Sequence, residues 1–92
     1  MGMVDDISSS ELENAHAASI HHRDVVMTST MCGCFYCLRR FAPEEIREWV
    51  DESGGVGTTA LCPRCGIDAV LGDASGIPIT DNFLRAMRRY WF

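Results

Sequence analysis

The sequence of 92 residues is 47% hydrophobic and 23% charged, with a formal net charge of −5. This length suits one small domain, the apolar content excludes a disordered chain, and no apolar run reaches the roughly 18 residues that span a membrane. The negative charge disfavours nucleic acid as the default partner, because such binding neutralises phosphates. The charge is uneven, however, with five acids against one arginine in residues 1–30 and eight against seven in residues 31–92.

Residues 9–21 are expected to form a helix that is capped by Ser9 or Ser10 and has a thin apolar side. This helix belongs to an acidic N-terminal segment, residues 1–24, which we expect to precede the main domain, residues 25–92. The segment lacks the apolar core of a secretory signal. We therefore expect a cytoplasmic protein in a reducing compartment, where clustered cysteines bind metal more often than they form disulfides.

The first half of the main domain contains one predicted helix. Residues 25–27 (VVM) are expected to form a short strand or a buried connector. Pro43 then opens a helix over residues 43–51, since proline favours the first helical turn. The apolar face of this helix is formed by Ile46, Trp49 and Val50, and the glycines that follow end it.

The second half contains a strand and a C-terminal helix. Residues 56–62 (VGTTALC) are short and β-branched, which predicts a strand, whereas residues 67–71 (IDAVL) suit either a strand or the first turns of a helix. Thr80 is expected to cap a final helix over residues 81–92. Its arginines lie on one side, and the other side is apolar, with Phe83, Leu84, Met87 and Trp91.

Two Cys-x-x-Cys turns are the strongest signal in the sequence. Cys34 and Cys37 form one pair, Cys62 and Cys65 form the other, and 24 residues separate them. Zinc prefers four tetrahedral ligands, thiolate is a favoured donor, and a tight turn aims two cysteines at one ion. The spacing predicts one structural zinc site made of these four residues. Buried inert thiols and a dithiol redox motif are weaker alternatives, and the second lacks its βαβ context.

Cys32 and the histidines fall outside this set. We expect Cys32 to be a bystander, although ligand exchange with Cys34, or a disulfide formed after oxidation, would make a redox-responsive zinc switch. His21 and His22 are expected at a solvated helix end rather than as metal ligands. No histidine follows His22, so neither a histidine–metal nuclease nor an open hydrolytic zinc site is supported, and we expect no enzyme.

Arginines and aromatic residues suggest a second possible surface. A basic face could be built from Arg39, Arg40, Arg64, Arg85, Arg88 and Arg89, with stacking surfaces from Tyr36, Tyr90 and Trp91. We favour instead a solvated face whose arginines pair with Glu44, Glu45, Glu48 and Glu52. The terminal Tyr-Trp-Phe is apolar for a chain end, so it is either folded onto the core or offered to a partner.

Several segments together resemble a known family. CGCFYC, F-x-P-x-E-I-x-x-W, TALCPRCGID, SG-x-PIT and the final WF are similar to a family of small bacterial cytoplasmic proteins of unknown function. The resemblance covers residues 20–92 and implies a bacterial, cytoplasmic protein, but it transfers no catalytic residue. More broadly, the paired turns resemble those of treble-clef and zinc-ribbon fingers, although Leu38 stands where glycine is usual after the first turn.

The sequence therefore predicts a small α+β zinc-finger domain, treble-clef or zinc-ribbon-like, with an N-terminal helix and a C-terminal amphipathic helix. Its expected function is that of a non-enzymatic protein-interaction or regulatory module with one Zn²⁺ and another protein as partner, away from the membrane. A nucleic-acid-binding finger that uses the arginines, and a redox-responsive switch that uses Cys32, are the alternatives.

Overall fold

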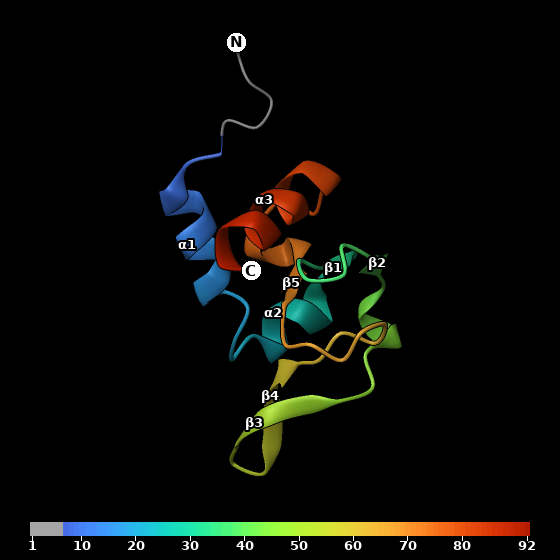
Figure 1. Cartoon of the computed structure of the whole chain (residues 1–92). Coiled ribbons are helices and arrows are strands. Elements are labelled where there is room, and N and C mark those ends of the chain that lie inside the picture. Colours follow the sequence, from blue (N-terminus) through green and yellow to red (C-terminus); the bar gives the residue numbers. More distant parts are fainter. Residues whose placement is uncertain (1–6) are drawn as a thin grey trace.

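The computed structural model describes residues 7–92, and three α-helices lie within this part of the chain. Two of them are close to the N-terminus and the third ends the chain (Figure 1). Short 3₁₀ turns follow two of the strands. The helices are α1 (Ser9–Ala17), α2 (Arg23–Thr28) and α3 (Asp81–Trp91), and the turns are η1 (Pro43–Glu45) and η2 (Asp73–Ser75).

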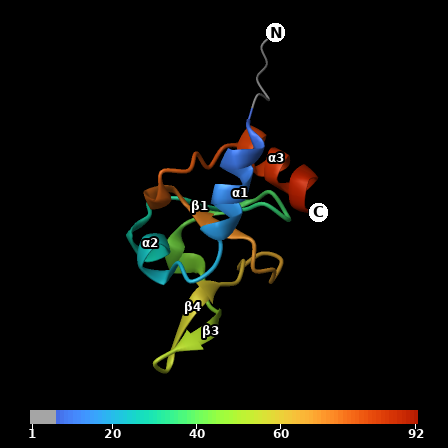
Figure 2. The same ribbon diagram turned by 90° about the vertical axis from the view of Figure 1, so that its left-hand side faces the viewer.

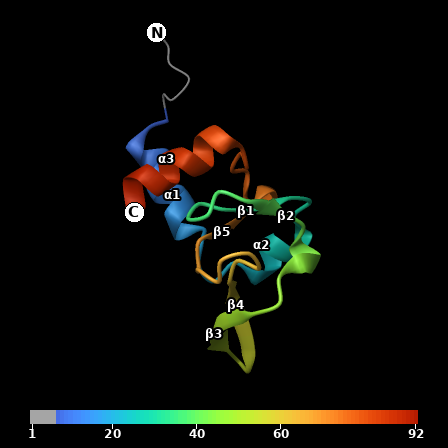
Figure 3. The same ribbon diagram turned by 45° about the vertical axis from the view of Figure 1, so that its right-hand side comes forward.

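Five short strands form two antiparallel sheets. The first sheet has the order β2 (Arg40–Phe41), β1 (Cys32–Cys34) and β5 (Val70–Gly72), and the second is the hairpin of β3 (Trp49–Ser53) and β4 (Val56–Ala60). Figure 3 shows the first sheet in the middle of the molecule and the hairpin projecting below it. The described chain is thus a small mixed helix-and-sheet fold, as the sequence predicts at this coarse level.

The helix predicted for residues 43–51 is wrong. Only Pro43–Glu45 forms a helical turn, and the residues from Trp49 onward form strand β3. This strand pairs with β4 across a two-residue turn, Gly54–Gly55, whose φ angles are +63° and +84°. Positive φ at both central residues defines the turn type that matches the twist of a hairpin. The glycines that were expected to end a helix therefore close a hairpin.

The N-terminal helix is shorter than predicted and is followed by a second one. Ser8, not Ser9 or Ser10, caps α1: its Oγ accepts from the N–H of Glu11, whose carboxylate accepts from the N–H of Ser8. Helix α1 ends at Ala17. The backbone then turns through His21, where φ is +49°, before α2 begins at Arg23. Residues 25–27, expected as a strand or connector, are thus helical. The first six residues of the expected acidic segment lie outside the described residues.

Other predicted elements are confirmed. The Oγ1 of Thr80 accepts from the N–H of Phe83 and caps α3. Strand β4 matches the strand expected from residue 56. The segment 67–71, expected as either a strand or the start of a helix, leads into strand β5. The apolar side of α3 is buried through Phe83, Leu84 and Met87.

The core lies between the first sheet and the helices. Leu71, Leu84, Met87, Val26 and Val70 are its largest fully buried apolar side chains. Helix α1 lies beside α3 in both Figure 1 and Figure 2. It adds two buried side chains to the core, those of Leu12 and Ala15. The three-residue strands alone bury little surface, so this small domain depends on packing from all three helices.

Candidate metal centre

Four cysteine sulfurs lie together at one point of the fold. The Sγ atoms of Cys34, Cys37, Cys62 and Cys65 are all within 4.8 Å of one another. The Sγ atoms of Cys34 and Cys65 are 3.7 Å apart, and so are those of Cys37 and Cys62. A tetrahedral zinc ion with Zn–S bonds of about 2.3 Å requires sulfurs about 3.8 Å apart. The donor set and its spacing therefore fit one tetrahedral ion, and the thiols are not joined as disulfides.

The two cysteine turns have matching backbone geometry. In the first, the N–H of Cys34 donates to the carbonyl of Arg39, and the N–H of Leu38 donates to the carbonyl of Cys34. In the second, the N–H of Cys62 donates to Ile67 and that of Gly66 donates to Cys62. Each turn thus repeats the same two hydrogen bonds at the same spacing. This repetition explains why two segments with different sequences present their sulfurs alike.

Backbone amides also point at the first sulfur of each turn. The Sγ of Cys34 accepts from the N–H groups of Tyr36 and Cys37 at 3.4 and 3.5 Å, and the Sγ of Cys62 accepts from Arg64 at 3.3 Å. Hydrogen bonds to the charged form of a group favour that form. These amides therefore support the thiolates that a metal requires.

The position after each turn adopts a left-handed conformation. Its φ is +81° at Gly66 and +68° at Leu38. The departure from glycine at Leu38 thus leaves the geometry of the first turn intact. A left-handed residue other than glycine costs roughly 1–2 kcal/mol, which the surrounding hydrogen bonds must offset.

Burial and hydrogen bonding shift the pKa values of the thiols in different directions. Burial raises the pKa of Cys34 well above its usual range and raises that of Cys65 as well. Burial acts in the same direction on Cys37, but hydrogen bonds from the backbone of Arg39 and from neighbouring thiols outweigh it and lower its pKa. A divalent cation among the sulfurs would favour the deprotonated form of all four.

Cys32 does not belong to this group of sulfurs. It lies in β1, is fully buried, and its backbone pairs with Phe41 and Gly72. Burial, followed by the charges of Asp73 and Glu44, raises the pKa of its thiol to about 12. A buried, protonated thiol is a poor target for oxidants, which attack exposed thiolates.

The adjacent histidines His21 and His22 occupy different environments. His21 is exposed, and its Nδ1 lies 2.9 Å from the Oγ1 of Thr58. His22 is only 5% exposed, so the expectation of a solvated helix end is wrong for this residue. Its Nδ1–H donates to the carbonyl of Ala18, and its Nε2 accepts from the N–H of Ala60. His22 is a structural link that the sequence analysis missed, because its partner on β4 is 38 residues away.

All six arginines of the predicted basic face line cavities that adjoin the cysteine turns. These are Arg39, Arg40, Arg64, Arg85, Arg88 and Arg89. Of the four glutamates expected to neutralise them, only Glu45 forms an ion pair within residues 7–92, with Arg64. Trp91, which the sequence offered either as a stacking surface or as part of the apolar side of the last helix, stacks on His16 of α1, with ring centroids 3.9 Å apart.

Comparisons of the chain with protein families, curated proteins and solved structures gave no match. The family resemblance stays a prediction, and the treble-clef and ribbon alternatives stay open. Within residues 7–92, no helix has both the length and the apolar character needed to cross a bilayer. What the structure establishes is a four-cysteine group that could hold a metal ion in a small mixed fold.

Proposed function

We propose that Cys34, Cys37, Cys62 and Cys65 bind one structural zinc ion. The observation that carries this proposal is the 3.7 Å separation in two sulfur pairs, close to the edge of a zinc–thiolate tetrahedron. Two turns with the same hydrogen bonds supply the donors. The four-thiolate set suits zinc by ligand type as well as by geometry.

The proposed ion supports the fold rather than a reaction. Four protein ligands complete the tetrahedron, and no position remains for the water or substrate of a hydrolytic site. The ion would also join the loop after β1 to the loop after β4. We therefore assign the chain the role of a non-enzymatic, zinc-stabilised binding module, whose partner is recognised by the surface beside the metal.

Replacement of one ligand tests this role. Cys62→Ser is expected to lose the zinc ion and most of the folded structure, because structural zinc contributes on the order of 10 kcal/mol in small domains. Native mass spectrometry would measure the metal, and circular dichroism with thermal melting would measure the fold. Elemental analysis of the wild type would distinguish zinc from iron, which the same thiolates also bind.

Cys32→Ala is the matched control, since it removes a buried thiol that lies outside the sulfur group. This variant should keep one zinc ion per chain and lose only packing stability. A folded, metal-free wild-type protein, or a Cys62→Ser variant with the wild-type melting temperature, would refute the proposal. Equal zinc loss in both variants would mean that Cys32 also serves the metal.

A further inference from the structure

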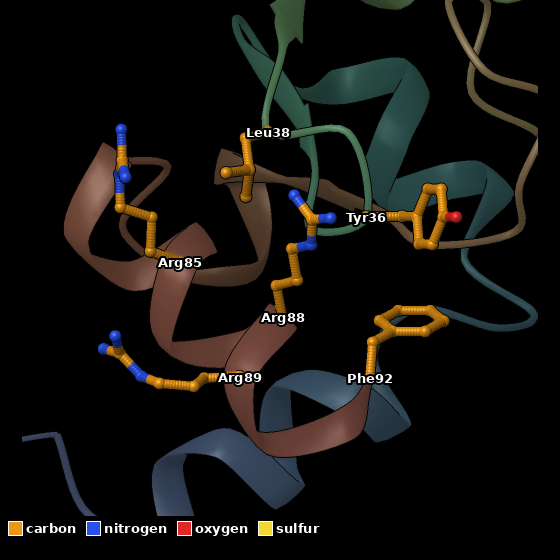
Figure 4. Close-up of a pocket in the computed structure, with 6 residues that line it drawn as sticks. All are labelled: Tyr36, Leu38, Arg85, Arg88, Arg89 and Phe92. Carbon is orange, nitrogen blue, oxygen red and sulfur yellow. The ribbon is translucent and has the colours of Figure 1, made fainter.

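A basic cavity of about 650 Å³ lies beside the first cysteine turn. Three arginines of α3 line it, together with Phe92, the residue that follows the helix. The first cysteine turn and the residue after it supply Tyr36 and Leu38. In Figure 4 the side chain of Arg88 reaches from α3 toward the turn, between Leu38 and Tyr36. Arg85 and Arg89 extend from the same helix on the far side of Arg88 from the aromatic rings.

A second cavity, of about 590 Å³, continues this surface. Its lining consists of Leu38, Arg39, Arg40 and Arg64, so Leu38 is a wall of both cavities. We call the two cavities together the basic groove. It extends past the first turn to Arg64, which lies within the second Cys-x-x-Cys turn. A surface of this extent suits an extended chain better than a single small anion.

The groove is strongly positive. Among residues 7–92, no acidic residue lines either cavity. Arg40 pairs with Asp81 at 2.8 Å and Arg64 pairs with Glu45 at 2.6 Å. Within residues 7–92, the other four arginines of the groove form no ion pair. A cluster of guanidinium groups with so few carboxylates nearby attracts polyanions, above all those that carry phosphate.

Aromatic rings lie at the same place as these charges. Tyr36 and Phe92 are 38% and 62% exposed, and their rings meet edge to face at a centroid distance of 4.9 Å. The guanidinium of Arg88 lies 5.6 Å from the centre of the Tyr36 ring. Exposed aromatic rings and stacked guanidinium groups along a basic groove are the combination that binds unpaired bases together with their phosphates.

We propose that the basic groove binds single-stranded nucleic acid, with Arg85, Arg88 and Arg89 on the phosphates and Tyr36 and Phe92 against the bases. This inference rests on the proposed function, because the zinc-binding turn carries Tyr36 and Leu38. A duplex keeps its bases stacked internally and would leave the rings unused. An acidic peptide would match the charge but offers no planar bases.

The net charge of −5 does not exclude this binding, because many acidic side chains lie on elements that do not line the groove. Acidic side chains outside the groove include Glu11 and Glu13 on α1, Asp24 on α2, and Asp51 and Glu52 on the β3–β4 hairpin. The net charge of the whole chain, taken by itself, favours a protein partner. The local charge beside Tyr36 and Phe92 favours nucleic acid, since binding depends on the potential at the groove.

Fluorescence anisotropy with labelled single-stranded DNA and RNA of about ten nucleotides tests the proposal. Zinc content and circular dichroism are recorded on every sample. We expect binding by the zinc-loaded wild type that weakens steeply with salt. Arg88→Ala should make the plot of log K against log salt less steep by about 0.7 per lost phosphate contact, and Phe92→Ala should weaken binding at least about fivefold.

Two variants serve as matched controls. Arg47→Ala removes one positive charge outside both cavities, and Tyr90→Ala removes an exposed aromatic side chain outside both. Wild-type affinity in both controls supports the groove. Equal weakening by Arg47→Ala and Arg88→Ala would overturn it, as would equal or tighter binding of a DNA duplex or of an acidic peptide of the same charge.

The state of the metal separates the two proposals. Folded, zinc-loaded protein that binds no single strand at low salt overturns this inference and leaves the structural zinc site standing. Folded protein without zinc that binds through Arg88 and Phe92 supports the groove and refutes the metal site. Folded protein with neither property refutes both.

Discussion

At the scale of single residues, His22 joins the end of α1 to strand β4. Its Nδ1–H donates to Ala18, its Nε2 accepts from Ala60, and its backbone N–H donates to the carbonyl of Thr58. A carbonyl can only accept, so Nδ1 carries the proton and Nε2 must be unprotonated to accept. The hydrogen bonds therefore require the neutral imidazole.

The pKa of His22 makes the stability of the fold depend on pH. Burial is the main cause that lowers this pKa in the folded state, against an opposing effect of the bond to Ala18. The unfolded chain, with a histidine pKa near 6.5, takes up a proton first as the pH falls. The stabilisation that neutral His22 provides is therefore fully present above about pH 6.5 and declines as the pH falls below that value. Melting temperatures between about pH 8 and pH 5.5 measure this decline.

His22→Gln removes the titrating group and should flatten that part of the pH profile, relative to the wild type. Protonation of the cysteines also loosens a zinc site in acid, but it acts on both proteins and cancels in the difference. His21→Gln is the control and should keep most of the decline, because the charge of His21 is the smallest of the three causes that shift the pKa of His22. Identical profiles for wild type and His22→Gln would contradict the role assigned to His22. His22→Ala should cost about 1–3 kcal/mol for each buried partner left unpaired.

The residues of the candidate metal centre could be predicted because the pattern that indicates them is local in the sequence. Two Cys-x-x-Cys turns specify their own geometry, and the structure brings all four sulfurs together. The role of His22 could not be predicted, because its partner on β4 is distant in sequence and no local pattern indicates it. The left-handed conformation of Leu38 could not be predicted either, because leucine has no preference for positive φ.

At the scale of elements, the β3–β4 hairpin shows where local patterns fail. Ile46, Trp49 and Val50 have helical spacing, yet Trp49 pairs with Ala60 and Val50 with Thr59. Hydrogen bonds to a second strand outweigh a weak helical preference that covers only two turns. The signal that could have revealed the hairpin is Gly54–Gly55, since two glycines between apolar segments are typical of a two-residue hairpin turn.

Helix α2 illustrates the opposite failure. Val25, Val26 and Met27 favour a strand by composition, but Val26 is fully buried in a helix that packs between η2 and β4. Packing from distant segments decides its structure. The C-terminal helix α3 was predictable, by contrast, because its cap and its apolar periodicity agree with its final environment.

Trp91 attaches α1 to α3, and its loss should release α1. Its ring stacks on His16, and its Nε1–H donates to the carbonyl of Leu12 at 3.3 Å. Trp91→Ala should destabilise the protein by about 1–3 kcal/mol, from the lost stacking and the lost hydrogen bond. Hydrogen exchange should show faster exchange in α1 than in the wild type.

Tyr90→Phe provides the control for that experiment. Its hydroxyl donates to the carboxylate of Glu13 on the surface, and the variant removes only this exposed bond. Exchange in α1 should stay at the wild-type rate. Faster exchange in both variants, or in neither, would show that Trp91 is not the residue that holds α1 in place.

At the scale of the whole molecule, the cysteines connect the two sheets. Cys34 and Cys37 belong to β1 and the turn after it, and Cys62 and Cys65 follow β4 of the hairpin. The first sheet has strands of only two or three residues, and a pair of such strands is marginally stable alone. A metal held by both turns would therefore stabilise both sheets at once.

Removal of the metal is expected to unfold both sheets together. A chelator should abolish the protection of amides in β1 and in β4 in one transition, and added zinc should restore it, because zinc binding and folding are linked. Hydrogen exchange followed by mass spectrometry measures both strands in one sample. Loss of protection in β1 alone would mean that the hairpin folds independently of the metal.

Tyr36 lies inside the first cysteine turn and also in the wall of the basic groove. Metal and ligand would therefore act on one short segment of backbone. Thermodynamic linkage makes such coupling reciprocal: any factor by which zinc tightens the groove for a strand is also the factor by which a bound strand tightens the site for zinc. A strand in the groove would thus slow the exchange of zinc with cellular chelators, and zinc supply would set how much of the protein is able to bind.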